Sequence, residues 1–411
     1  MSLYKEAMSI LHNAIHESLP TTAVQKAMQK IEMPTGKVIV VAIGKAGWEM
    51  AKAAASVLGE RVHAGIVLTK YDHSQGAIGN FEICEAGHPV PDRQSYASTE
   101  KVLALTEHLS ENDLVLFLVS GGGSALFEKP LLPENEMADI TKQLLASGAD
   151  IVEMNTLRKR FSAVKGGRFG QWCQPAKMVS IILSDIIGDP LDMIASGPAY
   201  PDSTTAADAL AIVQKYKLSL SEKAQTLLQQ ETPKTLTGIT SMVTGSVTQL
   251  CMAAKEACVQ LGYQTTILST SLCCQAKEAG SFLASMAQYH QNTEQSLAFI
   301  IGGETVVQLT GKGMGGRNQE LALSAAQGIS GLTDTCLFSV GSDGTDGPTD
   351  AAGGYVTGET KEMLAKKGIT IFDVLQNNDA YHALQQVENG LIITGATGTN
   401  VNDVAVLLIK R

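Results

Sequence analysis

The sequence predicts an α/β protein with two α/β domains, because short apolar runs alternate with helical patterns along most of the chain. In the clearest case, the run 37–43, apolar after its first residue, passes through Gly44 and Lys45 into a helical pattern at 48–54. A fully apolar run of this length is typical of a parallel strand buried on both faces. Strands that alternate with helices form doubly wound sheets, so we expect a Rossmann-like, mostly parallel first domain.

The length of 411 residues also favours two domains, since a domain commonly holds about 100–200 residues. Residues 203–236 are polar and helical and end at Thr232-Pro233-Lys234, after which the α/β pattern starts again. We therefore expect a first domain at 1–236 and a smaller, mixed α/β domain at 237–411. Ligands of open α/β sheets sit beyond the carboxyl ends of the strands, so a cleft between the two domains is expected.

The individual elements follow from the periodicity of apolar residues. In the first domain, a helical period covers 1–30, strands are expected at 37–43, 64–68, 81–85, 113–119 and 178–183, and helices at 48–54, 95–109, 206–217 and 221–230. In the second domain, strands are expected at 241–244, 264–268, 297–301, 306–309, 335–340, 391–393 and 404–409, and helices at 248–261, 275–291, 319–327, 359–367 and 381–388.

Charge and composition exclude several classes of protein. The formal net charge is −10, and no run of Lys and Arg is long enough to follow a polyanion, so we expect no nucleic acid partner. No apolar stretch reaches the length of a membrane span, so we expect no membrane partner. The seven cysteines form no CxxC pair, which favours the reducing cytoplasm.

Three features at the ends of expected strands are suited to binding an anion. Ser120-Gly121-Gly122-Gly123-Ser124 follows the most hydrophobic strand, and its glycines let backbone amides approach a ligand closely. Gly44-Lys45 precedes a helix, where free amides and the helix dipole favour an anion. Five cations lie within eleven residues at 158–168, so a solvated basic face or an anion site that includes Arg158 is expected there.

Carboxylates and further glycines follow other strands. Asp185, Asp189 and Asp192 lie just past the strand at 178–183, where they would hold Mg²⁺, accept a substrate proton or cap a turn. The loose GxGxxG at 311–316 is weak support for a dinucleotide site. The sequence contains no HExxH motif and no GxSxG elbow. Glycine-rich loops, a few cations and loop carboxylates are together the groups used in phosphoryl transfer.

The loops, taken in order, carry a family resemblance. They are Gly44-Lys45-Ala46, Gly87-His88-Pro89-Val90-Pro91-Asp92, the glycine-rich 120–126, Arg158-Lys159, Lys165-Gly166-Gly167, 183–189, 194–198, Gly302-Gly303-Glu304-Thr305, 315–320, 343–347 and 397–403. The chain resembles the glycerate 2-kinases of the MOFRL type over residues 44–403. It departs from that pattern at Arg160, at Ala396 and at Ala199-Tyr200, which lie beside the motifs.

The resemblance implies transfer of a phosphoryl group from ATP, with Mg²⁺, to D-glycerate to give 2-phosphoglycerate. The family's catalytic groups fall on Lys45, Asp185 and Arg317. The site residues expected with them are Ser120, Gly121, Gly122, Gly123, Ser124 and Arg158 for the substrate, Gly315, Gly316, Asn318, Gly344, Thr345, Thr399 and Asn400 for the nucleotide, and Asp189, Glu304 and Asp343 for the metal.

Two alternative functions stay open. A nicotinamide-dependent hydroxypyruvate reductase would act on a similar small acid, and some family members carry that name, but the dinucleotide fingerprint is missing. A non-catalytic sugar-acid-binding protein would use the same loops. A homodimer is also left open by the sequence.

Overall fold

The computed structural model describes residues 2–411, which form two compact units. The first unit contains Ala23–Ser184 and Asp189–Thr244. The second unit contains the N-terminal stretch up to Thr22, the short segment Asp185–Gly188, and Gly245–Arg411. This division differs from the one expected at 236/237, because the N-terminal helix packs in the second unit and residues 239–244 complete the sheet of the first.

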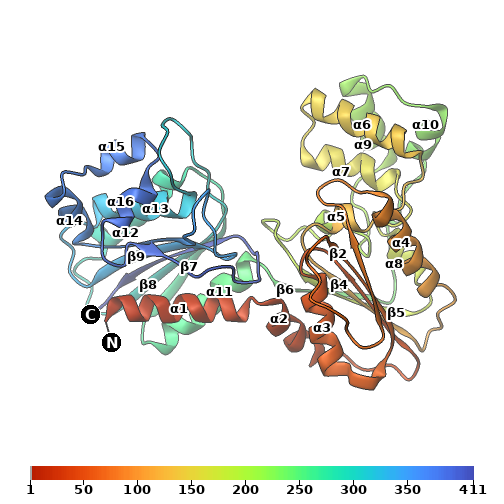
Figure 1. The fold of residues 1–411 in the computed structure, drawn as a ribbon, viewed down its shortest axis with the longest axis horizontal. Coiled ribbons are helices and arrows are strands. Elements are labelled where there is room, and N and C mark those ends of the chain that lie inside the picture. The colour runs from red at the N-terminus through yellow and green to blue at the C-terminus, as the bar shows by residue number, and fades with distance from the viewer. Residues whose placement is uncertain (1) are drawn as a thin grey trace. The chain divides into compact units, whose positions relative to one another are not determined.

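The first unit is built on a six-stranded sheet in the order β3-β2-β1-β4-β5-β6 (Figure 1). Its strands are β1 (Val38–Ile43), β2 (Val62–Lys70), β3 (Phe81–Ala86), β4 (Leu114–Val119), β5 (Lys177–Leu183) and β6 (Ile239–Gly245). The pairs β1–β2, β2–β3, β1–β4 and β4–β5 are all parallel. This is the strand order of doubly wound folds, so the predicted fold class is confirmed.

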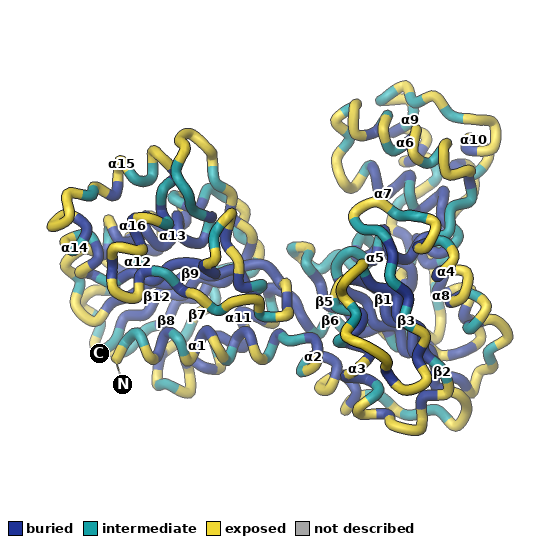
Figure 2. Tube along the Cα trace, viewed as in Figure 1, coloured by how far each residue is buried: buried dark blue, intermediate teal, exposed yellow. Residues whose placement is uncertain are grey.

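Helices cover both faces of this sheet because the side chains of each strand alternate between two cores. In β1, Val38, Val40 and Ala42 pack in a core shared with α2 (Pro20–Met28) and α3 (Gly47–Leu58). Residues Ile39, Val41 and Ile43 of the same strand pack in the opposite core. That core also takes residues of α4 (Arg93–Leu105) and α8 (Arg168–Trp172). The strands are accordingly the buried part of the unit (Figure 2).

A group of helices with a separate core belongs to the same unit. Its members are α6 (Glu134–Ser147), α7 (Ile151–Arg160), α9 (Ala206–Tyr216) and α10 (Glu222–Leu228). Leu144, Leu157 and Leu228 are among the buried residues of this core. The group matters for function because α6 and α7 contribute one wall of the largest cavity described below.

The second unit has a mixed six-stranded sheet in the order β11-β10-β9-β12-β8-β7. Its strands are β7 (Gln264–Leu272), β8 (Leu297–Gly303), β9 (Thr335–Gly341), β10 (Gly353–Thr357), β11 (Leu391–Ile392) and β12 (Asp403–Ile409). Only β7–β8 is parallel, and the other four pairs are antiparallel. The expected strand at 306–309 is wrong, because Val306 forms only an isolated bridge with Gln275.

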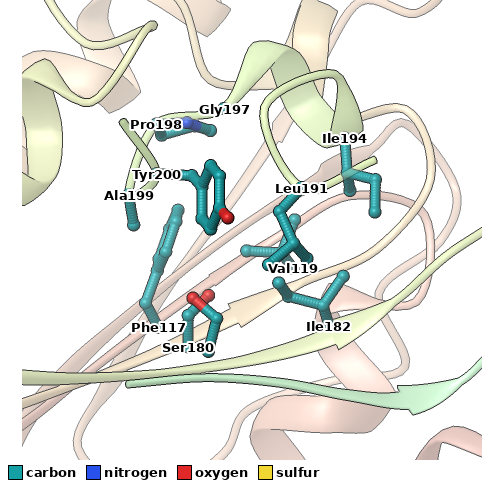
Figure 3. A pocket seen from close by; sticks show the side chains of 11 residues that line it. Phe117, Val119, Ser180, Ile182, Leu191, Ile194, Gly197, Pro198, Ala199 and Tyr200 are labelled. Carbon is teal, nitrogen blue, oxygen red and sulfur yellow. The ribbon is translucent and has the colours of Figure 1, made fainter. Parts of the chain in front are cut away.

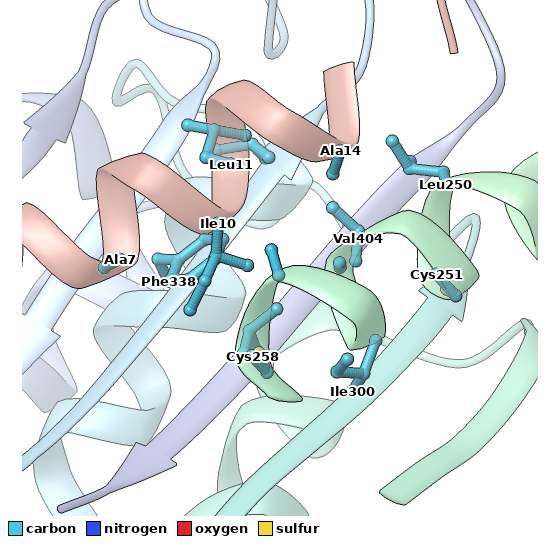
Figure 4. Close-up of a cluster of buried hydrophobic side chains, with 14 of the residues drawn as sticks. Ala7, Ile10, Leu11, Ala14, Leu250, Cys251, Cys258, Ile300, Phe338 and Val404 are labelled. Carbon is cyan, nitrogen blue, oxygen red and sulfur yellow. The ribbon is translucent and has the colours of Figure 1, made fainter. Parts of the chain in front are cut away.

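The helix α1 (Leu3–Glu17) packs on one face of this second sheet, beside α11 (Val247–Gln260) (Figure 4). Its apolar side chains Ala7, Ile10, Leu11 and Ala14 are fully buried. A buried carboxylate adds a polar anchor: Glu6 accepts hydrogen bonds from the Tyr263 hydroxyl and from Lys410, each at 2.6 Å. These contacts explain why the N-terminal helix belongs with the C-terminal half of the chain.

The other face of the second sheet carries the remaining helices. They are α12 (Ala276–Tyr289), α13 (Arg317–Gly328), α14 (Thr360–Lys366), α15 (Ile371–Gln376) and α16 (Ala380–Gln385). In β12, Ala405, Leu407 and Ile409 pack against this layer, while Val404, Val406 and Leu408 face α1 and α11. Within residues 2–411, none of the helices has the length and apolar character needed to cross a bilayer.

Candidate active site

Two loops meet at the carboxyl edge of the first sheet, between β1 and β4. The chain leaves β1 toward β2 on one side and later returns with β4 on the other, so this position is a topological switch point. The amide of Lys45 donates to Gly121 O at 2.9 Å. The Ser120 hydroxyl donates to Ile43 O and accepts from the amide of Ala46, both at 3.1 Å. Ser120, expected to bind substrate, is therefore occupied in holding the two loops together.

Close backbone contact at this point requires glycine. Gly44 has a φ of +105°, and a Cβ there would overlap Ser120. Gly122 has a φ of +87°, and a Cβ there would lie 3.0 Å from the His88 ring and 3.4 Å from Cγ of Lys45. The aliphatic part of Lys45 and the ring of His88 therefore both lie against Gly122. Lys45 itself is exposed, and its ammonium has no partner within residues 2–411.

The glycine-rich loop presents unused donors. Among the described residues, the amides of Gly121 and Gly122 donate to no acceptor, and both residues are partly exposed. By contrast, Gly123 is buried against Ala195 and Ile43. Backbone amides with no protein acceptor are the donors that an anionic ligand needs at such an edge.

The last residue of this loop is fixed by a buried network. The Ser124 and Ser196 hydroxyls are 3.0 Å apart, and Ser196 donates to Oδ1 of Asn155 at 3.1 Å. The ammonium of Lys165 donates to Ser124 O at 2.8 Å. Sequence reasoning missed Asn155 and Ser196 as supports of the loop, since nothing in their local pattern shows which distant residue they contact.

Four of the five clustered cations at 158–168 are used inside the protein. Lys159 pairs with Asp192 and Asp202 at 3.3 and 3.0 Å, and Lys165 pairs with Glu128 at 3.1 Å. Arg160 and Arg168 donate to backbone carbonyls. The expectation of a solvated basic face is thus wrong, since Lys159, Arg160 and Lys165 have fully buried side chains.

Arg158 is the exception in that cluster. Its guanidinium makes no hydrogen bond or ion pair with any of residues 2–411, although the side chain is half-buried on α7. Burial lowers the pKa of Arg158, and the charge of Glu128 opposes that effect. A partly desolvated cation whose guanidinium is bonded to none of the described residues is suited to an anionic ligand, and the substrate role of Arg158 stays a prediction.

The first unit contains a cavity of about 760 Å³ beside the glycine-rich loop. Gly122, Ser124, Glu128 and Arg158 contribute its polar part. Its other lining residues come from the β3–α4 connection, from α4, from α5 (Gly123–Leu126) and the segment after it, and from α6: His88, Pro89, Val90, Pro91, Tyr96, Ala125, Pro130, Glu134, Asn135, Met137, Ala138, Thr141, Lys142 and Leu145. A volume of this size is typical of small-molecule sites.

A second pocket of this unit is too small to bind a substrate. It lies over the sheet between Phe117 and the segment that carries Leu191 and Tyr200 (Figure 3). Its volume of about 10 Å³ is roughly that needed for one water molecule. The large cavity beside Gly122 is therefore the better candidate for ligand binding in the first unit.

In the second unit, Arg317 lies in an ion-pair network at one edge of the sheet. The antiparallel register places Asp403 beside both Gly303 and Gly341, where glycines leave room for it. Arg317 donates to both carboxylate oxygens of Asp403, at 2.5 and 3.0 Å, and to Glu304 at 3.0 Å. Burial alone would lower the pKa of Arg317, but these carboxylates outweigh burial and raise it.

The start of α13 is capped by a buried carboxylate. Asp346 accepts from the amides of Asn318 and Gln319 at 3.1 and 2.9 Å, and a side chain at Gly316 would overlap it. The buried side chain of Asn318 also bonds Asp346 and Ser339. Burial raises the pKa of Asp346 to about 6. The amide and side chain of Asn318 are thus bonded within the protein, and the nucleotide contacts expected at Gly315, Gly316 and Asn318 stay predictions.

The other expected nucleotide residues lie in two nearby loops of the second unit. Thr345 donates from its amide and hydroxyl to Asp343, at 2.9 and 3.0 Å. Thr399 is buried and donates to Ser18 O at 2.8 Å, so it anchors the segment after α1. Gly344 has a φ of +87° and lies against Gly395, and Asn400 is exposed. Of this set, Asn400 alone has an exposed side chain with no bond to another described residue.

The expected catalytic and metal carboxylates have distinct surroundings. Asp185 is half-buried in the second unit, and its backbone carbonyl accepts from Asn402 at 3.3 Å. Oδ1 of Asp189, in the first unit, is buried without a partner. Glu304 is paired with Arg317, and Asp343 accepts from Thr345. No group of three or more His, Cys, Asp or Glu among residues 2–411 is arranged to hold a metal ion. Mg²⁺ that binds with a nucleotide needs only one or two carboxylates, so these single acids still fit such an ion.

The fold and these loops define a class of two-unit α/β proteins with a glycine-rich loop at the switch point of a doubly wound sheet. Residues 6–229 match a domain of unknown function, DUF4147, and residues 297–403 match the MOFRL family. The chain belongs to the glycerate 2-kinase family of the MOFRL type, as its relatives show.

The relatives span the full length of the chain. A D-glycerate 2-kinase of Thermotoga maritima is 49% identical, with 99% of each chain covered. A glycerate 2-kinase of Pyrococcus horikoshii is 39% identical over 91% of this chain and 88% of the relative. A putative hydroxypyruvate reductase of Agrobacterium vitis is 39% identical, over 92% of this chain and 88% of the relative.

Solved structures agree with these relationships. The crystal structure of the Thermotoga maritima glycerate kinase matches with a TM-score of 0.94 at 49% identity, covering 99% of both chains. A crystal structure of a Pyrococcus horikoshii protein matches with a TM-score of 0.95 at 37% identity, covering 100% of this chain and 99% of the other.

Proposed function

We propose that this protein is a D-glycerate 2-kinase, which transfers the γ-phosphoryl group of ATP to the 2-hydroxyl of D-glycerate with the help of Mg²⁺. The observation that carries the proposal is the 49% identity, over 99% of both chains, to a relative that bears this name. The anion-binding groups at the switch point of the first sheet give that likeness a chemical basis.

The acid would bind in the cavity beside the glycine-rich loop. The guanidinium of Arg158 lacks a counter-ion, and the amides of Gly121 and Gly122 lack acceptors among the described residues. A carboxylate would satisfy both kinds of group through charge-assisted hydrogen bonds. The substrate role expected for Gly121, Gly122 and Arg158 is therefore retained in the proposal, whereas Ser120 and Gly123 act as supports of the loop.

Lys45 and Arg317 would act on the transferring phosphoryl group. Catalysis of phosphoryl transfer consists mostly of positioning and of stabilising charge in the transition state. Lys45 offers an ammonium with no partner within residues 2–411, and Arg317 is oriented by Asp403. Asp185 would orient the 2-hydroxyl of the acid or accept its proton.

ATP and Mg²⁺ would be bound mainly through the nucleotide's phosphates. When bound, the ion would neutralise charge on the phosphoryl oxygens, and Asp189, Glu304 and Asp343 are the carboxylates proposed to hold it. Gly344, Thr345 and Asn400 are the residues proposed to lie near the nucleotide. A cytoplasmic location would supply ATP and would keep the seven free cysteines reduced.

The rival function is a nicotinamide-dependent hydroxypyruvate reductase, the name carried by some relatives. A dinucleotide site of a doubly wound fold needs G-x-G-x-x-G in the first strand–helix turn. The turn after β1 reads Gly44-Lys45-Ala46-Gly47-Trp48-Glu49, so Ala46 and Glu49 stand where the motif has its second and third glycines. This observation favours the kinase over the reductase.

One pair of assays separates the functions. Purified protein is incubated with D-glycerate, ATP and Mg²⁺ while ADP release is followed, and in parallel with hydroxypyruvate and NADH while absorbance at 340 nm is followed. We expect ADP release that depends on D-glycerate and no oxidation of NADH. Oxidation of NADH without ADP release would overturn the kinase proposal, and no turnover in either assay would favour a sugar-acid-binding protein.

A further inference from the structure

We propose that Glu128 determines substrate specificity by accepting a hydrogen bond from the 3-hydroxyl of D-glycerate through its Oε1 atom. Glu128 lies in the first unit, just after α5, and lines the cavity beside the glycine-rich loop. The inference rests on the proposed function, since it assumes that D-glycerate is the acid bound in this cavity.

The first argument is an acceptor without a donor. Glu128 is 5% exposed, and its Oε1 atom accepts no hydrogen bond from any of residues 2–411. A buried carboxylate oxygen left without a donor has lost its hydrogen bonds to water with nothing in return, which is a cost in folding free energy. Such a cost is tolerated where a ligand supplies the missing donor. A buried polar atom without a partner therefore points to a binding site.

The second argument is that Glu128 is held in place. Its other oxygen, Oε2, lies 3.1 Å from the ammonium of Lys165, a fully buried side chain. The same ammonium donates to Ser124 O and to Phe127 O, each at 2.8 Å. All three donors of Lys165 are thus used, and they tie Glu128 to the end of the glycine-rich loop. A preorganised acceptor of this kind discriminates between ligands better than a mobile one.

The third argument concerns which hydroxyl Glu128 would contact. Arg158 lines the same cavity and lacks a counter-ion, so the substrate carboxylate belongs there. The 2-hydroxyl must meet the phosphoryl group, and the carboxylate proposed to orient it or accept its proton is Asp185. The 3-hydroxyl is not phosphorylated, so it is the hydrogen-bond donor of the substrate that remains for Glu128.

The test compares D-glycerate with D-lactate, which has the same carboxylate and 2-hydroxyl but lacks the 3-hydroxyl. Dissociation constants are measured by calorimetry for wild type, Glu128→Gln and Glu134→Gln. Glu134 is an exposed acid of the same cavity, so it is the matched control. In the Gln variant the amide oxygen must face the donor Lys165, so the amide NH₂ replaces the acceptor on the other side.

We expect wild type and Glu134→Gln to bind D-lactate about 10- to 100-fold more weakly than D-glycerate, and this ratio to fall below about fivefold in Glu128→Gln. If Glu128 had a purely structural role, its substitution would weaken the binding of both acids equally. The ratio of the two dissociation constants would then stay unchanged, which would overturn the inference. Equal affinity of wild type for both acids would overturn it even if the variant does not fold. If wild type binds neither acid, the proposed function fails together with the inference, whereas the other failures leave the kinase proposal intact.

Discussion

Arg317 is joined to Asp403 by two hydrogen bonds, from Nε to Oδ2 at 2.5 Å and from Nη2 to Oδ1 at 3.0 Å. This two-point contact fixes the plane of the guanidinium, and its Nη1 atom donates to Oε1 of Glu304 at 3.0 Å. A cation fixed in this way needs little reorganisation when charge develops on a neighbouring group. The same contact also means that Arg317 supports the fold, which affects how its role is tested.

We predict that Arg317→Ala lowers kcat by roughly 10²–10⁴ and also lowers Tm. The fall in Tm follows because Asp403 would remain buried without its partner, at a cost of about 1–3 kcal/mol or more. Arg317→Lys should recover only part of the activity, since lysine lacks the planar fork.

The control for Arg317 is the double variant Arg317→Ala, Asp403→Asn, which removes the unpaired charge. Its Tm should return toward that of wild type while kcat stays low. If kcat recovers together with Tm, Arg317 acts through stability alone and has no catalytic role.

Lys45→Ala should lower kcat by roughly 10²–10⁴ with little change in KM or Tm. The ammonium of Lys45 has no partner within residues 2–411, and only its backbone is bonded to the glycine-rich loop. The matched control is Lys177→Ala, an exposed lysine at the opposite end of a parallel strand of the same sheet. Steady-state kinetics that show a kcat within about threefold of wild type for Lys45→Ala would remove this residue from the mechanism.

Gly44→Ala should be much more damaging than an alanine at another glycine with positive φ. A Cβ at Gly44 would overlap Ser120, whereas Gly59, with a φ of +56°, has open space around it. We expect Gly59→Ala to cost about 1–2 kcal/mol of unfolding free energy, and Gly44→Ala clearly more, since it adds a clash to the same strain. Equal losses in chemical denaturation would show that Ser120 can move away, and that the contact between the two loops is not rigid.

The carboxyl of Asp346 should make stability depend on pH between about 4 and 6. Burial raises its pKa in the fold to about 6 from an ordinary value of 3.8, so the folded protein holds this proton more tightly than the unfolded chain. Its contribution is fully present below pH 4 and is lost as the pH rises through 6, by on the order of 2–3 kcal/mol. The stability advantage of wild type over Asp346→Asn should therefore shrink between pH 4 and pH 7. A constant or growing advantage in thermal denaturation would contradict this assignment.

Much of the fold is readable from the sequence because the buried strands are continuous apolar runs. The runs at 37–43 and 113–119 identify β1 and β4, the two strands of the switch point. The domain boundary is not readable in the same way. Residues 239–244 pair with β5, a strand earlier in the chain, and α1 packs on α11, more than 200 positions away. Local sequence patterns therefore do not indicate either contact.

The candidate site is readable only in part. Glycines after buried strands indicate the loop at 120–124, but not that Ser120 is used to tie it to β1. Five clustered cations look alike in the sequence, and only their partners distinguish Arg158 from the other four. Glu128 carries no motif at all, and its importance depends on Lys165, which lies 37 positions away. Burial and partner choice are tertiary properties, and they decide which polar residues remain free for a ligand.

The central claim is transfer of a phosphoryl group to the 2-hydroxyl of D-glycerate, and the position of the phosphate tests it most directly. The purified protein, D-glycerate, ATP and Mg²⁺ are combined with enolase but without phosphoglycerate mutase, and absorbance at 240 nm is followed. Enolase dehydrates 2-phosphoglycerate only, so we predict immediate formation of phosphoenolpyruvate that requires both D-glycerate and ATP. Release of ADP with no rise in absorbance until mutase is added would show a 3-phosphorylated product and would contradict the account.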